Sequence, residues 1–153
     1  MENLDKIISY ILFKKPKIAE NGGAFRINKL LYFIQAYHLT IYNKPAFNNK
    51  ITCGMFGAIV RDFTKENRYY FHIEKYKNNS YLSLDKQIKK TVDKILNTFY
   101  SIDVFVLSNL TMNYIPFYKI KWDILELENL EVSQEWIKNF HKEHIKNNNG
   151  YIF

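Results

Sequence analysis

A single cysteine, Cys53, is the first candidate for chemistry in this 153-residue sequence. A cysteine nucleophile needs a general base within hydrogen-bond reach and surroundings that lower the pKa of its thiol. His38 and His72 are the candidate bases, but no motif in the sequence places either of them beside Cys53. A lone cysteine is more commonly a small buried hydrophobic residue. The sequence therefore favours a structural role for Cys53.

Two histidines near the C-terminus, His141 and His144, have a spacing that can support metal binding. Residues three apart share one face of an α-helix, so both rings could reach the same ion. A tetrahedral site needs more ligands, and no cysteine, aspartate or third histidine stands nearby at a customary spacing. Histidine also suits a helix C-terminus because its charged form meets the negative end of the dipole. We expect no metal and no cofactor.

Two further patterns contain parts of enzyme sites without completing one. Gly22 and Gly23 precede a predicted helix, but the sequence contains neither GxxxxGKS/T nor GxGxxG. Glu126 and Glu128 form a carboxylate pair, but nothing indicates an apolar pocket that would raise the pKa of one of them for acid catalysis. We therefore expect no catalytic residue and a protein that is not an enzyme.

The net charge of +7 raises nucleic acid as a partner. The stretch FKKPK, together with Arg26 and Lys29, could form a basic stripe that binds phosphate backbones without sequence specificity. However, most of the 22 basic residues are lysines in a sequence rich in Asn, Ile, Tyr and Phe, as an AT-rich gene would also produce. Nucleic-acid binding stays open as an alternative, and solvated lysines are the favoured interpretation.

An acidic run between Trp122 and Ile137 interrupts this basic character. It contains five acidic residues and no lysine or arginine. Such a run is usually a solvated face, and the alternative is a docking patch for a basic partner. The acidic residues are Asp123, Glu126, Glu128, Glu131 and Glu135.

Length and hydropathy predict one soluble domain. A chain of 153 residues can bury a sizeable core, and 47% of its residues are hydrophobic. The N-terminus lacks the layout of a signal peptide, and no apolar run reaches the length of a membrane span. We expect a cytoplasmic protein with no membrane partner.

One central helix should organise the fold. Apolar residues at helical spacing predict a first helix that ends before Pro16, and a second that begins near Phe25 or Arg26 and ends before the turn NKPAFNN. The second helix is apolar on nearly all sides, which predicts burial by surrounding elements, with an interaction surface as the alternative. Its expected core face comprises Ile27, Leu30, Leu31, Ile34, Tyr37, His38 and Ile41.

The remaining elements are shorter. Gly54 and Gly57 predict a bent loop, followed by a helix from Ala58. Alternating residues in 68–84 predict a β-hairpin. Further helices are expected near Asp85, over 102–110, and after an N-cap at Ser133, with a short strand at 125–128. The predicted fold is mainly α with a small β element (α+β): a compact single-domain helical bundle around one central apolar helix, plus a β-hairpin.

Two stretches carry a family resemblance: INKLLYFIQAYHLTIYNKPAFNNKITCGMFGAIVRDF and, some forty residues later, VLSNLTMNYIPFYK. Their order resembles the Panacea domain, also called the SocA-like domain, of bacterial antitoxins and phage-associated proteins. This sequence departs from the family pattern at Thr52-Cys53-Gly54 in place of Glu-Ala-Trp, and at Ala58, Met112 and Phe117 in place of Pro, His and Trp. The matching residues are Lys29, Leu30, Leu31, Tyr32, Phe33, Gln35, Pro45, Phe47, Gly57, Leu110, Thr111 and Pro116.

The resemblance covers about residues 1–121 of one domain spanning 1–153, with a C-terminal strand and helix at 122–146 and a tail at 147–153 that is expected to fray. It implies a non-enzymatic protein-binding domain, most simply an antitoxin that neutralises a co-encoded toxin by direct contact. A phage-type inhibitor or an adaptor of another host or defence protein is the alternative. The expected partner groove requires Tyr32 and Gln35 to be exposed. Its candidate residues are Tyr32, Gln35, Leu39, Phe56, Gly57, Thr111, Pro116 and Phe117.

Overall fold

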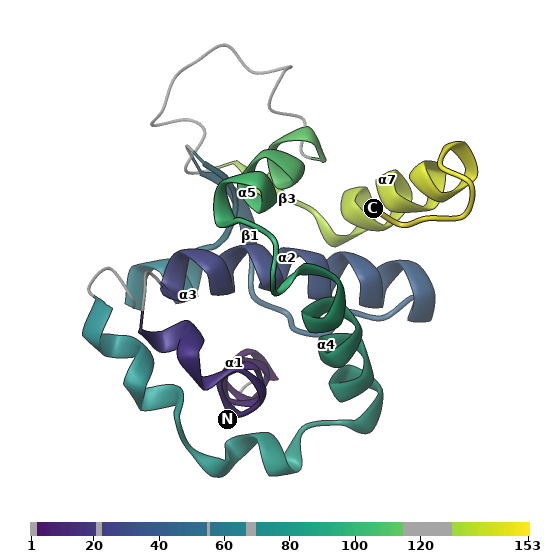
Figure 1. The fold of residues 1–153 in the computed structure, drawn as a ribbon. Coiled ribbons are helices and arrows are strands. Elements are labelled where there is room, and N and C mark those ends of the chain that lie inside the picture. The colour runs from purple at the N-terminus through teal and green to yellow at the C-terminus, as the bar shows by residue number, and fades with distance from the viewer. Residues whose placement is uncertain (1–2, 21–22, 55, 67–69, 115–129) are drawn as a thin grey trace.

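Helices make up most of the protein, and a small antiparallel sheet lies beside them (Figure 1). The expected class, mainly α with a small β element, is therefore confirmed. The structure is a computed structural model. It describes residues 3–20, 23–54, 56–66, 70–114 and 130–153.

The order of the elements defines the labels in Figure 1. Within the described ranges, no helix combines the length and apolar character needed to cross a membrane. The α-helices are α1 (Asn3–Lys14), α2 (Gly23–Tyr42), α3 (Arg61–Glu66), α4 (Lys86–Phe99), α5 (Val104–Asn113) and α7 (Gln134–Asn147). The 3₁₀ helices are η1 (Pro16–Ala19), η2 (Tyr70–Tyr76) and η3 (Asn79–Ser83). The strands are β1 (Ile51–Gly54), β2 (Gly57–Val60) and β3 (Glu131–Val132).

Local signals set several helix boundaries as predicted. Helix α1 ends at Lys14, before Pro16. The Asp85 carboxylate accepts a hydrogen bond from the Gln87 backbone N–H at 2.8 Å and caps α4. The Ser133 hydroxyl oxygen accepts one from the Trp136 N–H at 3.0 Å and caps α7. These caps satisfy N–H groups that the first turn of a helix leaves without partners.

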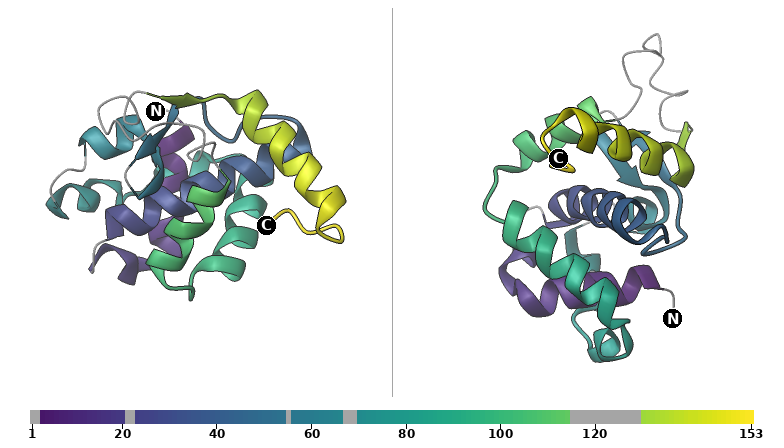
Figure 2. Two further views of the ribbon diagram at one scale, coloured as in Figure 1. Left: turned by 90° about the horizontal axis from the view of Figure 1, so that it is seen from above. Right: turned by 90° about the vertical axis from the view of Figure 1, so that its right-hand side faces the viewer.

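Helix α2 forms the centre of the fold, and α4, α5, α7 and β2 all pack against it (Figures 1 and 2). The predicted burial on nearly all sides is therefore confirmed. Tyr32, Phe33 and Ala36, which lie outside the expected core face, are fully buried. Ile41, in contrast, is 47% exposed, so its assignment to the core was wrong. It lies in the last turn of α2, one residue before the helix ends.

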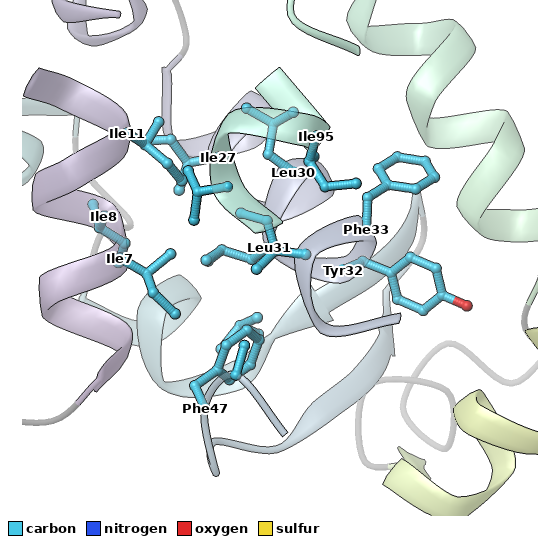
Figure 3. Close-up of a cluster of buried hydrophobic side chains, with 14 of the residues drawn as sticks. Ile7, Ile8, Ile11, Ile27, Leu30, Leu31, Tyr32, Phe33, Phe47 and Ile95 are labelled. Carbon is cyan, nitrogen blue, oxygen red and sulfur yellow. The ribbon is translucent and has the colours of Figure 1, made fainter. Parts of the chain in front are cut away.

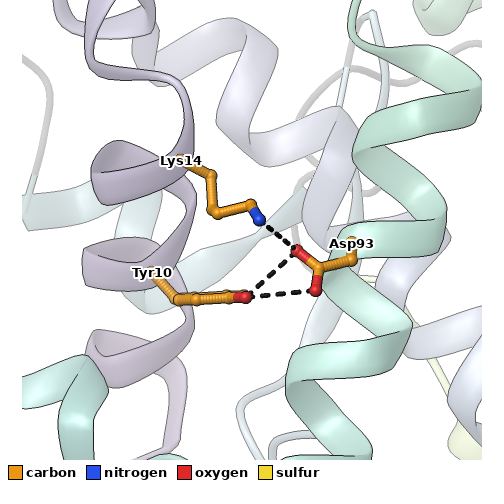
Figure 4. Close-up of polar contacts among 3 residues, drawn as sticks. All are labelled: Tyr10, Lys14 and Asp93. Carbon is orange, nitrogen blue, oxygen red and sulfur yellow. Dashed lines mark hydrogen bonds and ion pairs between the residues drawn. The ribbon is translucent and has the colours of Figure 1, made fainter.

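The helix α1 closes one side of this core. Its isoleucines point towards Ile27 and Leu31 of α2, with Phe47 across from them (Figure 3). A polar contact joins α1 to α4: the Tyr10 hydroxyl donates to the Asp93 carboxylate at 3.1 Å, and Lys14 pairs with the same carboxylate at 3.3 Å (Figure 4). Burial, together with Asp93, raises the pKa of Tyr10 to about 12.

The β-hairpin lies at a different place from the one predicted. Residues 70–76 and 79–83 form η2 and η3, whereas β1 and β2 pair as a hairpin, with Gly54 opposite Gly57. Ile73 and Tyr76 are buried three residues apart, which is the spacing of one face of a 3₁₀ helix. The glycine-containing stretch predicted as a loop forms the hairpin because Gly57, at φ +100°, can adopt the positive φ that the turn requires. Strand β3 pairs with the other edge of β1.

The C-terminal segment packs back onto the domain. The Phe153 ring meets Phe33 and Phe99 at centroid distances of 5.1 and 5.3 Å. The Ile152 carbonyl accepts a hydrogen bond from His141 on α7. The expected fraying of this tail was therefore wrong, because its aromatic end has a partner in the core. The strand expected at 125–128 lies outside the described residues.

Candidate functional site

The outer edge of β2 is covered by side chains from two helices. Its residue Ala58 donates its backbone N–H to the Thr111 hydroxyl at 3.2 Å, and its carbonyl accepts from the Lys29 ammonium group at 3.0 Å. The next outward-facing N–H, that of Val60, donates to the Asn28 side-chain oxygen at 2.8 Å. An edge strand otherwise presents free polar groups to any other strand. Lys29 and Thr111, both in the family-like motifs, therefore stabilise the hairpin from within.

Lys29 is fully buried, which removes it from the basic stripe considered above. Burial lowers the pKa of its amine from 10.5 to about 7. Its Nζ atom lies 4.9 Å from the centre of the Phe25 ring. Arg26 is also engaged within the domain, because its guanidinium donates to the carbonyls of Tyr100 and Ile102 at 3.1 and 2.7 Å. The basic stripe considered as an alternative thus does not form at Arg26 and Lys29.

Gln35 closes the turn that follows α2. Its side-chain oxygen accepts from the backbone N–H groups of Ala46 and Phe47 at 2.9 and 3.3 Å, and its NH₂ donates to the Phe47 carbonyl at 2.9 Å. The side chain is fully buried. The expectation that Gln35 is exposed in a groove is therefore wrong, because the turn needs all three hydrogen bonds inside the core.

Tyr32 is also fully buried, and it joins α2 to α7. Its hydroxyl lies 2.9 Å from His141 Nε2, and His141 Nδ1 lies 3.1 Å from the Ile152 carbonyl oxygen. A carbonyl only accepts, so Nδ1 carries the proton and Nε2 accepts from the tyrosine hydroxyl. The exposure expected for Tyr32 is therefore wrong, because His141 of α7 packs against it.

The same contacts account for His141 without a metal. Burial lowers the pKa of His141 to about 4, so the ring is neutral at pH 7. Both of its nitrogens have partners within the chain. Among the described residues, no group of three or more His, Cys, Asp or Glu side chains could hold a metal ion.

We expect Tyr32→Phe to lower the free energy of unfolding by about 1–2 kcal/mol, because His141 Nε2 loses its donor in a site closed to water. Urea unfolding of the two proteins measures this difference. Tyr151→Phe is the control, because Tyr151 is 68% exposed and its hydroxyl can reach water. Equal stability of the wild type and Tyr32→Phe would show that this hydrogen bond contributes nothing.

Cys53 is buried at the centre of β1, as the structural interpretation predicted. Burial raises the pKa of its thiol to about 11, so the nucleophilic thiolate is scarce at pH 7. His38 instead lies 2.8 Å from the Thr91 hydroxyl, between α2 and α4. The side chain of His72 lies outside those that the structure describes.

The acidic and glycine candidates also have local explanations. The Glu131 carboxylate on β3 pairs with the ammonium group of Lys50, the residue before β1, at 3.1 Å. Glu135 is exposed on α7. Gly23 begins α2, where a Cβ atom would lie 2.0 Å from the Ile18 carbonyl oxygen, so close packing requires glycine there. The other residues named for these features, Gly22, Asp123, Glu126 and Glu128, lie outside the described residues.

The residues expected to line one groove lie in separate places. Leu39 is buried, near the hollow lined by Asn43 and Pro45 and by the first turns of α7. Phe56 lies beside Phe25, and Phe25 and Leu39 are 14 positions apart on α2, which is about 21 Å along the helix. Within the part of the chain that the structure describes, Leu39 and Phe56 therefore do not lie side by side. Pro116 and Phe117 lie outside the described residues.

Phe56, Gly57 and Thr111, in contrast, are brought together. Thr111 bonds the residue after Gly57, and the Ser108 hydroxyl donates to the Phe56 carbonyl. A Cβ atom at Gly57 would lie 2.1 Å from Thr111 Oγ1, so α5 packs directly on the hairpin turn. Contact between this part of the predicted site and a partner stays a prediction.

An aromatic patch lies at this turn; we define it as the half-buried Phe25, the exposed Phe56 and Phe105, and Val106, which follows Phe105 on α5. The Phe25 ring contacts Phe56 and Phe105 at centroid distances of 6.1 and 6.2 Å. Phe56 is 56% and Phe105 65% exposed, and Val106 is 49% exposed. Sequence reasoning found Phe56 and missed the others. The run Val104 to Leu107 was a signal, because four consecutive apolar residues cannot share the buried face of one helix.

Comparison with known proteins gives one family. A model described as "Antitoxin SocA-like, Panacea domain" matches residues 27–116, which run from α2 through the hairpin and α4 to the end of α5. No curated protein and no solved structure matches the chain. The match includes Phe56, Phe105 and Val106, as well as the buried polar residues that support the turn.

Proposed function

The chain belongs to the SocA-like Panacea antitoxin family, and from this premise we propose that it neutralises a co-encoded toxin by direct contact through the aromatic patch. An antitoxin role follows from the family in general terms. Direct binding, and the surface that performs it, are our proposal. We expect the two proteins to meet in the cytoplasm, and no chemical step is required of this chain.

The observation that carries the proposal is the gathering of three phenylalanine rings from separate elements, two of them exposed and the third half-buried. Phe25 comes from α2, Phe56 from the hairpin turn and Phe105 from α5. Aromatic residues supply large contact areas and often dominate the binding energy of an interface. Grouped exposed apolar residues are also a common mark of a protein-binding surface. The patch therefore offers an anchor for a protein partner.

The side chains that could take part in catalysis are buried within the domain. Cys53 is protonated at pH 7, and His141 uses both ring nitrogens inside the domain. Lys29 holds the hairpin edge. Each of these groups thus has a structural task.

Co-expression with the neighbouring open reading frame tests the proposal. We expect the neighbour alone to stop growth, this chain to restore it, and the two proteins to purify together. Phe56→Ala should then weaken the complex roughly 10- to 100-fold, because it removes a central aromatic anchor. Isothermal titration calorimetry with the purified neighbour measures this change.

Phe13→Ala is the matched control. Phe13 is 57% exposed, almost the same as Phe56, but it stacks on Tyr81 in a separate cluster. We expect Phe13→Ala to bind like the wild type. A harmless neighbour without a complex would overturn the antitoxin assignment to that partner. A complex that Phe56→Ala does not weaken would overturn the assignment of the surface. Salt-sensitive binding of nucleic acid in place of protein would favour the basic-protein alternative.

A further inference from the structure

We propose that Ser108 and Thr111 are positioning residues of the aromatic patch: they hold the turn between β1 and β2 so that Phe56 is directed towards the partner before binding. This inference rests on the proposed function and deepens it. It explains how an exposed side chain on a short turn can act as a fixed anchor. The two residues act on the main chain of the turn and do not themselves touch the partner.

The hydroxyl groups of α5 form a continuous set of hydrogen bonds with the turn. Ala58 N–H donates to Thr111 Oγ1 at 3.2 Å, and the Thr111 hydroxyl donates to the Ser108 carbonyl at 2.9 Å. The Ser108 hydroxyl in turn donates to the Phe56 carbonyl. A hydroxyl has one donor and two acceptor positions, so Thr111 can make both of its contacts at once. The main chain is therefore held on both sides of Gly57.

Two other features fix the same turn. Lys29 donates to the Ala58 carbonyl from α2, so Ala58 is bonded from both helices. Gly57 has a positive φ of 100°, and a Cβ atom there would lie 3.0 Å from the Ser108 carbonyl oxygen as well as 2.1 Å from Thr111 Oγ1. The turn can approach α5 this closely only with glycine at position 57.

Burial separates positioning from direct contact. Thr111 is fully buried and Ser108 is 3% exposed, whereas Phe56 is 56% exposed. An effect of Thr111 on binding must therefore pass through the turn. Ordering a flexible turn residue at the moment of binding would weaken affinity on the order of tenfold, because its backbone freedom is lost then. A turn that is already ordered avoids that loss.

The first test uses the free protein and needs no partner. Amide hydrogen exchange should show Ala58 protected in the wild type, and Thr111→Val should speed its exchange by up to about tenfold. Thr91→Val is the matched control, because Thr91 is equally buried and its hydroxyl bonds His38 and Gln87 away from the turn. Ala58 exchange that is fast in the wild type, or equally slow in Thr111→Val, would overturn the proposal.

The second test measures affinity for the purified neighbouring protein. We expect Thr111→Val to weaken binding about tenfold, Thr91→Val to leave it unchanged, and Thr111→Ser, which keeps the hydroxyl, to restore it. In a Phe56→Ala background, Thr111→Val should add no further loss, because the anchor that it positions is absent.

The outcomes distinguish the two proposals. If Phe56→Ala binds like the wild type, the proposed binding surface is wrong. If Phe56→Ala weakens binding but Thr111→Val matches Thr91→Val, the surface stands and the positioning role is wrong. Equal losses from Thr111→Val with and without Phe56 would also overturn positioning, because the effect would then not act through that side chain.

Discussion

Replacing Gln35 with leucine should lower the free energy of unfolding by about 3–5 kcal/mol. The substitution leaves the N–H groups of Ala46 and Phe47 and the carbonyl of Phe47 without their side-chain partner. The site is fully buried, so water cannot replace the lost bonds without opening the core. The free energy of unfolding of a domain is commonly only about 5–15 kcal/mol, so this substitution would remove a large share of it.

Chemical unfolding followed by circular dichroism measures this loss. Gln87→Leu is the control: Gln87 lies exposed on α4, and the same replacement there should change stability by less than about 0.5 kcal/mol. A loss below about 1 kcal/mol in Gln35→Leu would mean that the turn finds other partners. It would also show that the turn does not depend on the Gln35 side chain.

Three buried polar residues of the family-like motif share a structural role. Lys29, Gln35 and Thr111 all belong to this motif, and each is buried with its polar group bonded to backbone. Their shared task is to hold the two irregular segments beside α2: the turn at 46–47 and the hairpin. Tyr32 performs a comparable task towards α7. The motif thus encodes a scaffold, and the proposed binding surface is what that scaffold presents.

Local patterns predicted several helix boundaries, because caps and apolar spacing act over a few residues. The helix predicted from Ala58 begins only at Arg61, because residues 58–60 belong to β2. Asp85 and Ser133 marked the starts of α4 and α7, and the surplus of apolar residues on α2 indicated a central helix. The hairpin was misplaced because its edge is satisfied by distant residues. Ala58 and Thr111 are 53 positions apart, and no local pattern reveals that Thr111 will cap a strand.

The candidate site was predicted only in part, for a related reason. Polar and aromatic residues in a motif could be either internal or exposed, and the choice depends on which elements cover them. Helix α7 covers Tyr32 through His141, which no pattern in α2 could show. Phe25 and Phe105 come together only when α2 and α5 pack beside the hairpin. Phe56 could be predicted because Gly57, its neighbour in the sequence, indicated a loop there.

The buried amine of Lys29 leads to the second large effect: the stability of this protein should rise with pH above neutrality. Burial lowers the pKa of Lys29 from 10.5 to about 7. Between these values the unfolded chain holds a proton that the folded protein has released, so raising the pH favours the folded state. The stabilisation is complete above pH 10.5 and is lost as the pH falls towards 7. It amounts to on the order of 5 kcal/mol over this window.

A narrower window avoids the thiol of Cys53, whose pKa burial raises to about 11, since that group makes the folded state less favourable at higher pH. From pH 7 to 8.5, Lys29 should contribute about 1.5 kcal/mol. Subtracting the urea unfolding free energies of Lys29→Met from those of the wild type at each pH isolates this contribution, because the two proteins share every other titrating group. A difference that is constant from pH 7 to 8.5 would show that Lys29 keeps its ordinary pKa. A difference that rises with pH would show that the hairpin is held by a lysine that becomes neutral within the folded protein.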